Sequence, residues 1–376
     1  MQTASEMFDF IQGKRPERLA ASPLFTNVMV QQLHGHRWLG SSCDSRVIED
    51  IAAVGRTCGF VPFFEVLGVE IGMLDYDTHE VEERENLHRV NVIRTPQGDN
   101  TLVDTFEPFH SRQISHYPFS SPADLDAYDY FIRRSIDRID QCRPVLKRVV
   151  EEAGQRAIPY FIASAPHRCF SLFAANDLIL LFMDEPERMD QICALNASLS
   201  MVAAKVANEC GIKIIFEGTE GTLYSPPLLR RYALPYMLAL RKQVCSLGGL
   251  YYLHECGRMA ALRDDGFYAD LAPDILEGFQ APPSGDVNDL PAFMDTLPES
   301  VVSKGNLDLN FLLNRSAFEV KAEGIALLHR LDVRRRHILG GSCSALPGTP
   351  LDNLAALVEA VRTVNAESIR SGSQGD

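Results

Sequence analysis

Three side chains of the types that bind soft metal ions stand at two places in this chain. His254 and Cys256 lie in Tyr-Leu-His-Glu-Cys-Gly, and Cys343 lies in Gly-Gly-Ser-Cys-Ser, each where a short apolar run meets glycine-rich sequence. Because side chains alternate between the faces of a strand, His254 and Cys256 project to the same side of one strand end. Three protein ligands with an open fourth position are typical of a catalytic zinc, whereas structural zinc sites have four. The pattern therefore indicates a catalytic Zn²⁺ site.

Each ligand also has an ordinary alternative. A cysteine in an apolar run is commonly a small core residue, and a histidine there is commonly a hydrogen-bonded polar group. A disulfide is a further alternative, but nine scattered cysteines form no repeating framework, which favours reduced thiols in a cytosolic enzyme. The first residues do not form a signal peptide, and no apolar stretch approaches the roughly 18–20 residues that span a bilayer. We expect a cytoplasmic location.

The elements that must position these ligands follow a regular alternation. Apolar runs typical of buried parallel strands alternate with amphipathic stretches typical of helices. This order predicts an α/β fold, a (β/α)8 TIM barrel, whose active site lies at the carboxyl ends of the strands. A doubly wound sheet is disfavoured because the chain has no Gly-x-Gly-x-x-Gly after an early strand. The expected strands are 21–26, 60–67, 159–163, 213–217, 250–255, 274–279, 301–306 and 337–341, and the expected helices are 45–58, 123–154, 186–210, 225–247, 309–328 and 352–364.

One segment interrupts the alternation. Residues 75–117 are polar and strand-like, with a turn at Pro96-Gln-Gly-Asp, which predicts an inserted β-hairpin. It is either an external flap over one barrel end or a lid or partner-docking surface. We expect residues 1–370 to form a single barrel domain and residues 371–376 to be a disordered polar tail.

Composition limits the partners of the chain. Its 376 residues carry a net charge of -14, which disfavours binding to nucleic acid or to anionic membrane surfaces. Any anionic ligand therefore needs a local basic site that the overall charge does not supply.

Further candidate residues follow other expected strands. Glu217 and Glu220 lie in Phe-Glu-Gly-Thr-Glu-Gly, and each is either a solvated loop carboxylate, a resting-state zinc ligand or a base that accepts a thiol proton. Glu217, which continues the strand, is the first choice. Asn306 and Asp308 end another strand, where turn formation is the ordinary explanation. His167 is either a substrate contact or a loop histidine.

The order of motifs resembles the uroporphyrinogen decarboxylase superfamily over residues 158–364. The resemblance implies a TIM barrel, and it implies that Asn306 and Asp308 line the pocket. The motifs that carry it are Phe216-Glu-Gly, Ser225-Pro226, Ala233-Leu-Pro-Tyr236, Gly305-Asn-Leu-Asp308, Gly340-Gly-Ser-Cys343, Pro347-Gly-Thr-Pro350 and Asn353-Leu-Ala.

Within that superfamily, His-x-Cys with a distal cysteine resembles the zinc-dependent corrinoid-linked methyltransferases, such as the methylcobamide:coenzyme M enzymes. This resemblance implies that His254, Cys256 and Cys343 hold zinc and that zinc holds a thiol substrate as a thiolate. It also implies methylcobalamin as co-substrate, or a corrinoid protein as partner. Two thiolate ligands suit this chemistry, because they neutralise the ion and leave the substrate sulfur nucleophilic.

Alternatives to this function differ in direction or in class. The protein could instead move methyl from a methoxy-arene or methylamine donor to a Co(I) corrinoid protein. A non-enzymatic metal-storing barrel is another alternative. A uroporphyrinogen-type decarboxylase is a lesser alternative. Resemblance to that branch would imply an arginine-rich N-terminal block that binds the substrate carboxylates. The matching region here reads Ser22-Pro-Leu-Phe-Thr-Asn-Val-Met and contains no arginine.

Overall fold

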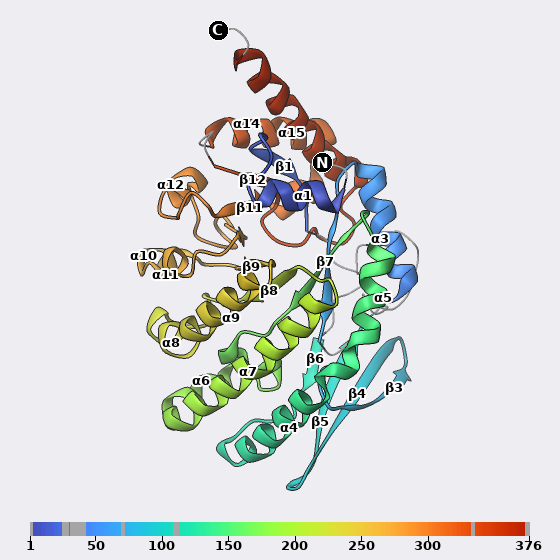
Figure 1. Ribbon diagram of the computed structural model, residues 1–376, viewed down its shortest axis with the longest axis vertical. Helices are drawn as coiled ribbons and strands as arrows, with labels where there is room; N and C mark the ends of the chain where they lie inside the picture. Colours follow the sequence, from blue (N-terminus) through green and yellow to red (C-terminus); the bar gives the residue numbers. More distant parts are fainter. Residues whose placement is uncertain are drawn as a thin grey trace.

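Eight parallel strands form the centre of the molecule (Figure 1). The computed structural model describes residues 3–24, 30, 43–68, 72–107, 113–331 and 335–372. The strands pair in the order β1-β12-β11-β10-β9-β8-β7-β2, which follows the chain around a circle. The Ser22 hydroxyl donates to the carbonyl of Val61 at 2.7 Å, which joins the β1 and β2 edges. The strands are β1 (Leu19–Ala21), β2 (Phe63–Leu67), β7 (Ile158–Ile162), β8 (Ile214–Gly218), β9 (Leu250–His254), β10 (Ile275–Glu277), β11 (Val302–Leu307) and β12 (His337–Gly341).

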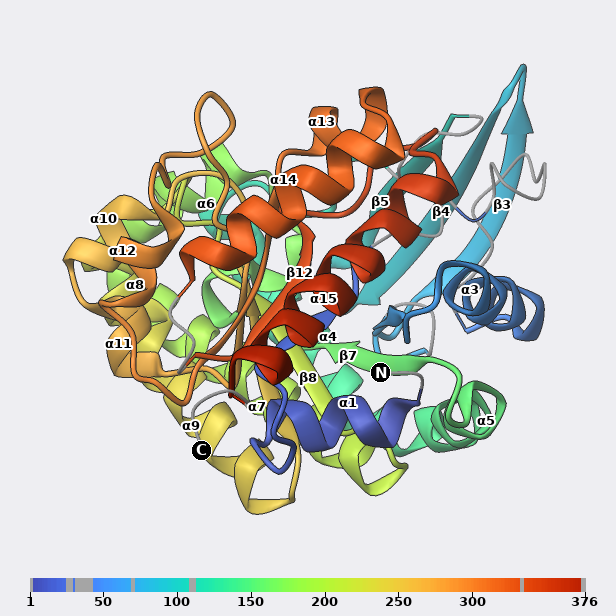
Figure 2. The same ribbon diagram turned by 90° about the horizontal axis from the view of Figure 1, so that it is seen from above.

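Side chains from every one of these strands meet in one buried cluster, so the predicted TIM barrel is confirmed. Helix α1 (Ala4–Ile11) closes the amino ends of the strands, because its Met7 and Phe10 are buried in the same cluster. In Figure 2, α1 lies at the bottom of the molecule and α13 (Leu309–Asn314), which follows β11, lies at the top. The strand residues of the cluster include Ala20, Phe63, Ile158, Ile214, Leu250, Ile275, Val302 and Ile338.

A layer of helices surrounds the barrel. Three helices expected to be continuous are divided, because Pro144 and Pro235 each open a new helix and Ser316 forms a capping box with Glu319. The helices are α3 (Ser45–Cys58), η1 (Pro122–Asp124), α4 (Leu125–Arg138), η2 (Ile139–Cys142), α5 (Arg143–Ala153), η3 (Pro166–Ser171), α6 (Ala175–Asp184), α7 (Pro186–Glu209), α8 (Pro226–Tyr232), α9 (Leu234–Ser246), α10 (Ala260–Asp264), α11 (Phe267–Leu271), α12 (Leu290–Met294), α14 (Ala317–Arg330) and α15 (Leu351–Gly372).

The inserted segment is larger than the expected hairpin. It forms a four-stranded antiparallel sheet of β3 (Asp77–Glu83), β4 (Asn86–Thr95), β5 (Gly98–Phe106) and β6 (Gln113–His116). Ile93 and Leu102 are buried on one face, and the Tyr76 ring before β3 stacks on Phe131 of α4 at 5.4 Å. Figure 2 shows the sheet standing to one side of the barrel, next to α3.

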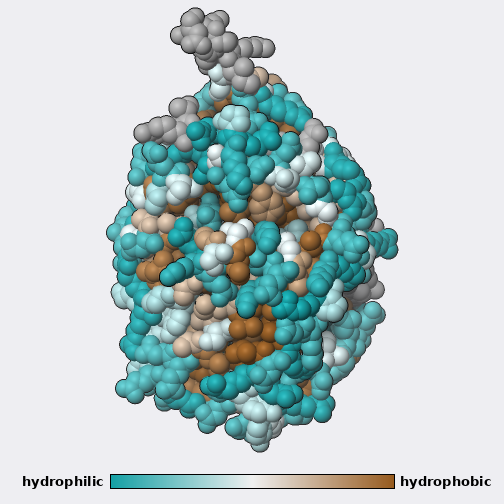
Figure 3. All heavy atoms as spheres, in the orientation of Figure 1, coloured by the Kyte–Doolittle hydropathy of each residue, from teal (hydrophilic) through white to brown (hydrophobic). Residues whose placement is uncertain are grey.

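Some expected features reach beyond the described residues. Residues 25–26 of the first expected strand and residues 373–376 of the expected tail lie outside them, while α15 continues through Gly372. Figure 3 shows a mostly hydrophilic face with hydrophobic side chains gathered in its lower half. Among the described helices, none combines the length and apolar character needed to cross a membrane.

Candidate metal centre

The structure brings His254, Cys256 and Cys343 together at the carboxyl ends of β9 and β12. The Nε2 atom of His254 lies 2.8 Å from the Cys256 sulfur and 3.5 Å from the Cys343 sulfur, and the two sulfurs are 3.5 Å apart. We call these three residues the triad. His254 ends β9, and Cys256 and Cys343 lie two residues beyond the ends of β9 and β12. Strand alternation and barrel closure therefore produce the convergence together.

These donors fit a zinc ion. A tetrahedral centre with Zn–S near 2.3 Å and Zn–N near 2.0 Å separates its ligand atoms by about 3.5–3.8 Å. Two of the three separations match that range, and the shorter contact between His254 and Cys256 needs only a small side-chain adjustment. Within the part of the chain that the structure describes, the triad is the group of histidine, cysteine and acidic residues that is able to hold a metal ion. It supplies three ligands, as an open catalytic site requires.

Two triad residues, Cys256 and His254, hold protons that a cation would displace. A hydrogen bond from Cys256 lowers the pKa of Cys343 to about 4, and the same contact raises the pKa of Cys256. Burial opposes protonation of His254, but hydrogen bonds to Cys343 and Glu277 outweigh it and raise its pKa to about 10. Zn²⁺ requires thiolates and a neutral imidazole, so metal binding would release protons here.

A buried acid and a buried base support His254 from inside the barrel. The Nδ1 atom of His254 donates to Glu277 at 2.7 Å, which leaves Nε2 directed at the two sulfurs. Glu277 also accepts hydrogen bonds from Lys304 and from the Tyr252 hydroxyl. The Glu277, Lys304 and Tyr252 side chains are fully buried, and the ammonium of Lys304 lies 5.6 Å from the centre of the Tyr252 ring. The carboxylate thus fixes the orientation of the imidazole, as a carboxylate does behind histidine ligands of metal sites.

Sequence reasoning missed Glu277 and Lys304, although a signal was present. Each is a charged residue inside an apolar run, in Ile-Leu-Glu-Gly and Val-Ser-Lys-Gly. A charged side chain in a strand buried on both faces requires a partner or a function. The two residues are directly opposite in the β10–β11 register, as Glu277 pairs with Lys304.

The loop after β8 is joined to the metal-binding segment. The Gly221 amide donates to the carboxylate of Glu255 at 2.7 Å, and the Thr222 hydroxyl donates to the Cys256 carbonyl at 3.3 Å. Glu255 lies between the two ligands of the β9 end and is fully buried. The position of residues 219–222 is therefore coupled to the position of the triad.

Glu217 lies on the opposite face of β8 from the triad. The ring of the preceding residue, Phe216, stacks on His254 at 5.6 Å inside the barrel, so Glu217 points outward to the helix layer. There it accepts a hydrogen bond from the Tyr251 hydroxyl and is 1% exposed. Burial raises the pKa of Glu217 to about 8, against the effect of the Tyr251 hydrogen bond. The structure does not bring Glu217 to the metal centre.

Glu220 lies in the loop after β8, and His167 lies in η3 after β7. Glu220 forms an ion pair with Arg168, with Oε1 to Nη2 at 2.6 Å. His167 is fully buried, its Nε2 donates to the Thr219 carbonyl at 2.9 Å, and its ring contacts Tyr224 edge-on. Burial lowers the pKa of His167 to about 3, so the ring is neutral. His167 thus holds the β7 loop to the β8 loop.

Asn306 and Asp308 line a cavity of about 520 Å³ between the loop before α12 and helices α13 and α14. Asn306 donates to the Phe279 carbonyl at 2.9 Å. Asp308 caps α13 by accepting from the Phe311 amide at 2.8 Å, which is the turn role that its position indicated. The structure brings neither side chain into the triad.

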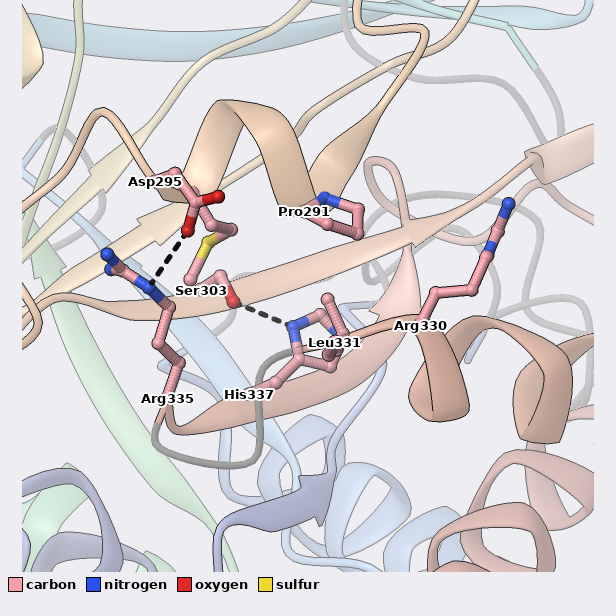
Figure 4. A pocket seen from close by; sticks show the side chains of 8 residues that line it. Pro291, Asp295, Ser303, Arg330, Leu331, Arg335 and His337 are labelled. Atoms are coloured by element: carbon pink, nitrogen blue, oxygen red, sulfur yellow. Dashed lines mark hydrogen bonds and ion pairs between the residues drawn. The ribbon is translucent and has the colours of Figure 1, made fainter.

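The pocket in Figure 4 is distinct from the metal centre. It has a volume of about 250 Å³, and Ser303 and His337 meet in it at 2.8 Å while Arg335 points to Asp295. Ser303 and His337 lie at the amino-terminal ends of β11 and β12, whereas the triad lies at the carboxyl ends. The pocket therefore takes no part in the chemistry of the triad.

A comparison with protein families shows which family this chain belongs to. Residues 109–364 match the model of the family described as uroporphyrinogen decarboxylase (URO-D). The chain belongs to the URO-D family. The triad, Glu277 and Lys304 all lie inside the matched residues of this URO-D family member. A search of curated proteins found no match.

A solved structure shares the fold of this URO-D family protein. It is similar to a methyltransferase from Methanosarcina mazei, with a TM-score of 0.67, 16% identity, and coverage of 96% of this chain and 98% of that one. A B12-independent methionine synthase from Shewanella sp. W3-18-1 is more distant, with a TM-score of 0.47, 12% identity, and coverage of 93% of this chain and 98% of that one. The first of these similarities shows a shared fold.

Proposed function

We propose that this protein is a zinc-dependent methyltransferase that moves a methyl group between a corrinoid and a thiol. The observation that carries the proposal is the convergence of one imidazole and two cysteine sulfurs at the carboxyl end of the barrel. The Methanosarcina mazei methyltransferase, which shares the fold, supports the reaction class. The charge of the donor set supports the acceptor, because two thiolates and a neutral imidazole suit the binding of a third sulfur better than the activation of water.

Zinc, when bound, would supply the positive charge that removes the thiol proton and holds the substrate sulfur at the mouth of the barrel. Cys256 and Cys343 would be its thiolate ligands and His254 its neutral ligand. Glu277 holds the His254 ring by its Nδ1 atom, so that Nε2 faces the two cysteine sulfurs and would be free to bind the ion. Lys304 neutralises Glu277 in the buried interior, which prevents an uncompensated negative charge beneath the site.

The transfer itself conserves atoms and electrons. The substrate thiol loses its proton to solvent, and its sulfur forms a bond to the methyl carbon of a methylcorrinoid. The cobalt–carbon bond breaks as the new bond forms, and its electron pair stays on cobalt, which passes from Co(III) to Co(I). The products are a methyl thioether and the reduced corrinoid. We propose that the corrinoid is methylcobalamin or the cofactor of a partner protein.

The test is a demethylation assay. Purified protein with measured zinc is mixed with methylcobalamin and one of several thiols, and loss of the cobalt–carbon bond is followed by absorbance. We expect thiol-dependent demethylation that stops when zinc is chelated and returns when zinc is restored. If no thiol supports the reaction, the proposal of methyl transfer from the corrinoid to a thiol fails. Methylation of a Co(I) corrinoid by a methoxy-arene or methylamine, with no thiol present, would then identify the reverse reaction.

A further inference from the structure

An ion pair of opposite charges lies next to the metal centre and has no role in the chemistry described above. Arg168 belongs to η3, which follows β7, and Glu220 belongs to the loop after β8. Their atoms Nη2 and Oε1 are 2.6 Å apart, and the side chains are 29% and 35% exposed. Both charges are therefore accessible from solvent, unlike the buried pair of Glu277 and Lys304.

Two sets of contacts place this pair beside the triad. Gly218 is the register partner of His254, and a side-chain carbon at Gly218 would lie 3.2 Å from the His254 carbonyl oxygen and 3.8 Å from Nη1 of Arg168. That carbon would point into the barrel mouth, because Gly218 is on the same face of β8 as Phe216. The guanidinium thus reaches over the end of β8. Glu220 immediately precedes Gly221, whose amide is bound to Glu255 between the two ligands of the β9 end.

The backbone that carries the pair is strained on both sides. Cys169, Phe170 and Ser171, which follow Arg168, have φ of 46°, 53° and 57°, and Glu220 has φ of 53°. These left-handed conformations are unfavourable for residues other than glycine and persist only where the surroundings hold them. The surroundings do so here, because the amide of the buried Asn196 donates to the Pro166 carbonyl at 2.8 Å. The backbone that carries the two side chains is therefore held in place, at η3 by Asn196 and after β8 by the bond from the Gly221 amide to Glu255.

The arrangement of charge selects the kind of ligand. Within the described residues, Arg168 uses Nη2 for Glu220 and Ser171, while no hydrogen bond engages its Nη1 or Nε. A ligand with only an anionic group would bind Arg168 next to the negative charge of Glu220. A zwitterion places an anion on Arg168 and a cation on Glu220, so both charges gain a partner. Opposite charges held side by side thus favour a ligand that carries an ammonium and a carboxylate on the same carbon.

We propose that Arg168 and Glu220 recognise the carboxylate and ammonium groups of an α-amino acid whose side-chain thiol reaches the metal centre. The acceptor is then an amino-acid thiol of the homocysteine type. This inference rests on the proposed methyl transfer to a thiol and specifies the class of that thiol. Arg168 and Glu220 are specificity-determining residues, and neither touches the transferred methyl group.

The experiment compares thiols that differ by one charged group. Zinc-loaded protein is assayed with methylcobalamin and homocysteine, with 4-mercaptobutyrate, which lacks the ammonium group, and with 3-mercaptopropylamine, which lacks the carboxylate. We expect the KM for homocysteine to be about 10- to 100-fold below the others, as one charge-assisted hydrogen bond predicts. Arg168→Met should raise the KM for homocysteine and 4-mercaptobutyrate and leave that for 3-mercaptopropylamine unchanged. Glu220→Gln should raise the KM for homocysteine and 3-mercaptopropylamine only.

A matched control is available on α8. Arg230 forms ion pairs with Asp265 at 2.6 Å and Asp270 at 2.9 Å and is 35% exposed, so Arg230→Met removes a surface charge of similar exposure that contacts neither the triad nor the Arg168–Glu220 pair and should change no KM. Equal changes for all three thiols in the Arg168 and Glu220 variants would overturn the proposal. So would a preference for 4-mercaptobutyrate or 2-mercaptoethanesulfonate over homocysteine that Glu220→Gln does not alter.

A binding measurement separates this inference from the proposed reaction. Calorimetry with 2-aminobutyrate, which has both charges of homocysteine but no thiol, should show binding to the wild-type zinc protein and about 10-fold or weaker binding to Arg168→Met. If 2-aminobutyrate binds in this way and no thiol is methylated, the recognition site stands and the proposed reaction fails. If thiols are methylated but 2-aminobutyrate does not bind, the recognition site is wrong and the reaction stands.

Discussion

The Nδ1 atom of His254 lies 2.7 Å from the carboxylate of Glu277, which places the acid directly behind the imidazole that faces the two cysteine sulfurs. The contact joins the neighbouring strands β9 and β10, where Glu277 is the register partner of His254. A carboxylate in this position fixes the ring and increases its basicity as a ligand. The predictions below follow from the triad and from the buried charges around it.

Removal of one triad sulfur should release the metal. In Cys343→Ala only Cys256 and His254 remain as ligands, and two ligands do not hold zinc firmly. We expect the zinc content to fall from about one ion per chain towards zero, measured by elemental analysis, with little change in circular dichroism. Cys245→Ala is the control, since Cys245 is an exposed free cysteine outside the triad. Retention of a full zinc content by Cys343→Ala would show that the metal is held elsewhere.

The support of His254 should be measurable as metal affinity. Glu277→Gln keeps an acceptor for Nδ1 but removes the negative charge that strengthens the ligand. We expect zinc to bind about 10- to 100-fold more weakly, as measured by competition with a chelating dye. Unchanged affinity in a variant that is folded would mean that the His254–Glu277 contact has no effect on the metal.

The buried pair of Lys304 and Glu277 should make a large contribution to stability. Lys304→Met leaves the fully buried carboxylate of Glu277 without its lysine counter-ion, with only His254 beside it. Loss of one partner from such a pair destabilises proteins by about 3–5 kcal/mol. Urea unfolding should show this loss, whereas Arg230→Met, which breaks the partly exposed ion pairs with Asp265 and Asp270, should change the free energy of unfolding by about 1 kcal/mol or less for each pair. Similar small effects in both variants would contradict the buried charge assignment.

Glu217 should make the stability depend on pH. Burial raises its pKa to about 8 in the folded protein, from an ordinary value of 4.5, so between these pH values the folded state retains a proton that the unfolded state has lost. Its contribution to stability is complete below about pH 4.5 and is lost as the pH rises through about 8. Glu217→Gln should therefore gain stability relative to wild type by a few kcal/mol as the pH rises from 5 to 8. A constant difference across that range would disprove the raised pKa.

The order of elements and the convergence of the three candidate metal ligands could be predicted from local sequence pattern. The spacing of His254 and Cys256 follows from the alternation of side chains along a strand, whatever the neighbours of that strand are. The position of Cys343 at the end of an apolar run indicates the same end of the barrel. Helix breaks were less accessible, because Pro144 lies in a continuous helical pattern and shows its effect only where η2 ends and α5 begins.

Which acidic side chains lie next to the candidate ligands could be read only from the tertiary structure. Glu217 and Glu277 are both acids at strand ends, and they differ in the face of the strand that they occupy. One faces Tyr251 in the helix layer and the other faces His254 in the barrel interior. The face is set by the phase of the strand relative to the barrel axis, and a short apolar run buried on both sides does not reveal that phase.

The amino-acid sequence by itself determined which side chains can bind a soft metal and that strands and helices alternate into a barrel, because both depend on residue type and local spacing. The tertiary structure alone decided that Lys304 neutralises Glu277 and that Arg168 pairs with Glu220. These partners come from different strands or loops, and they meet only after the register and closure of the barrel have fixed which strand ends are neighbours.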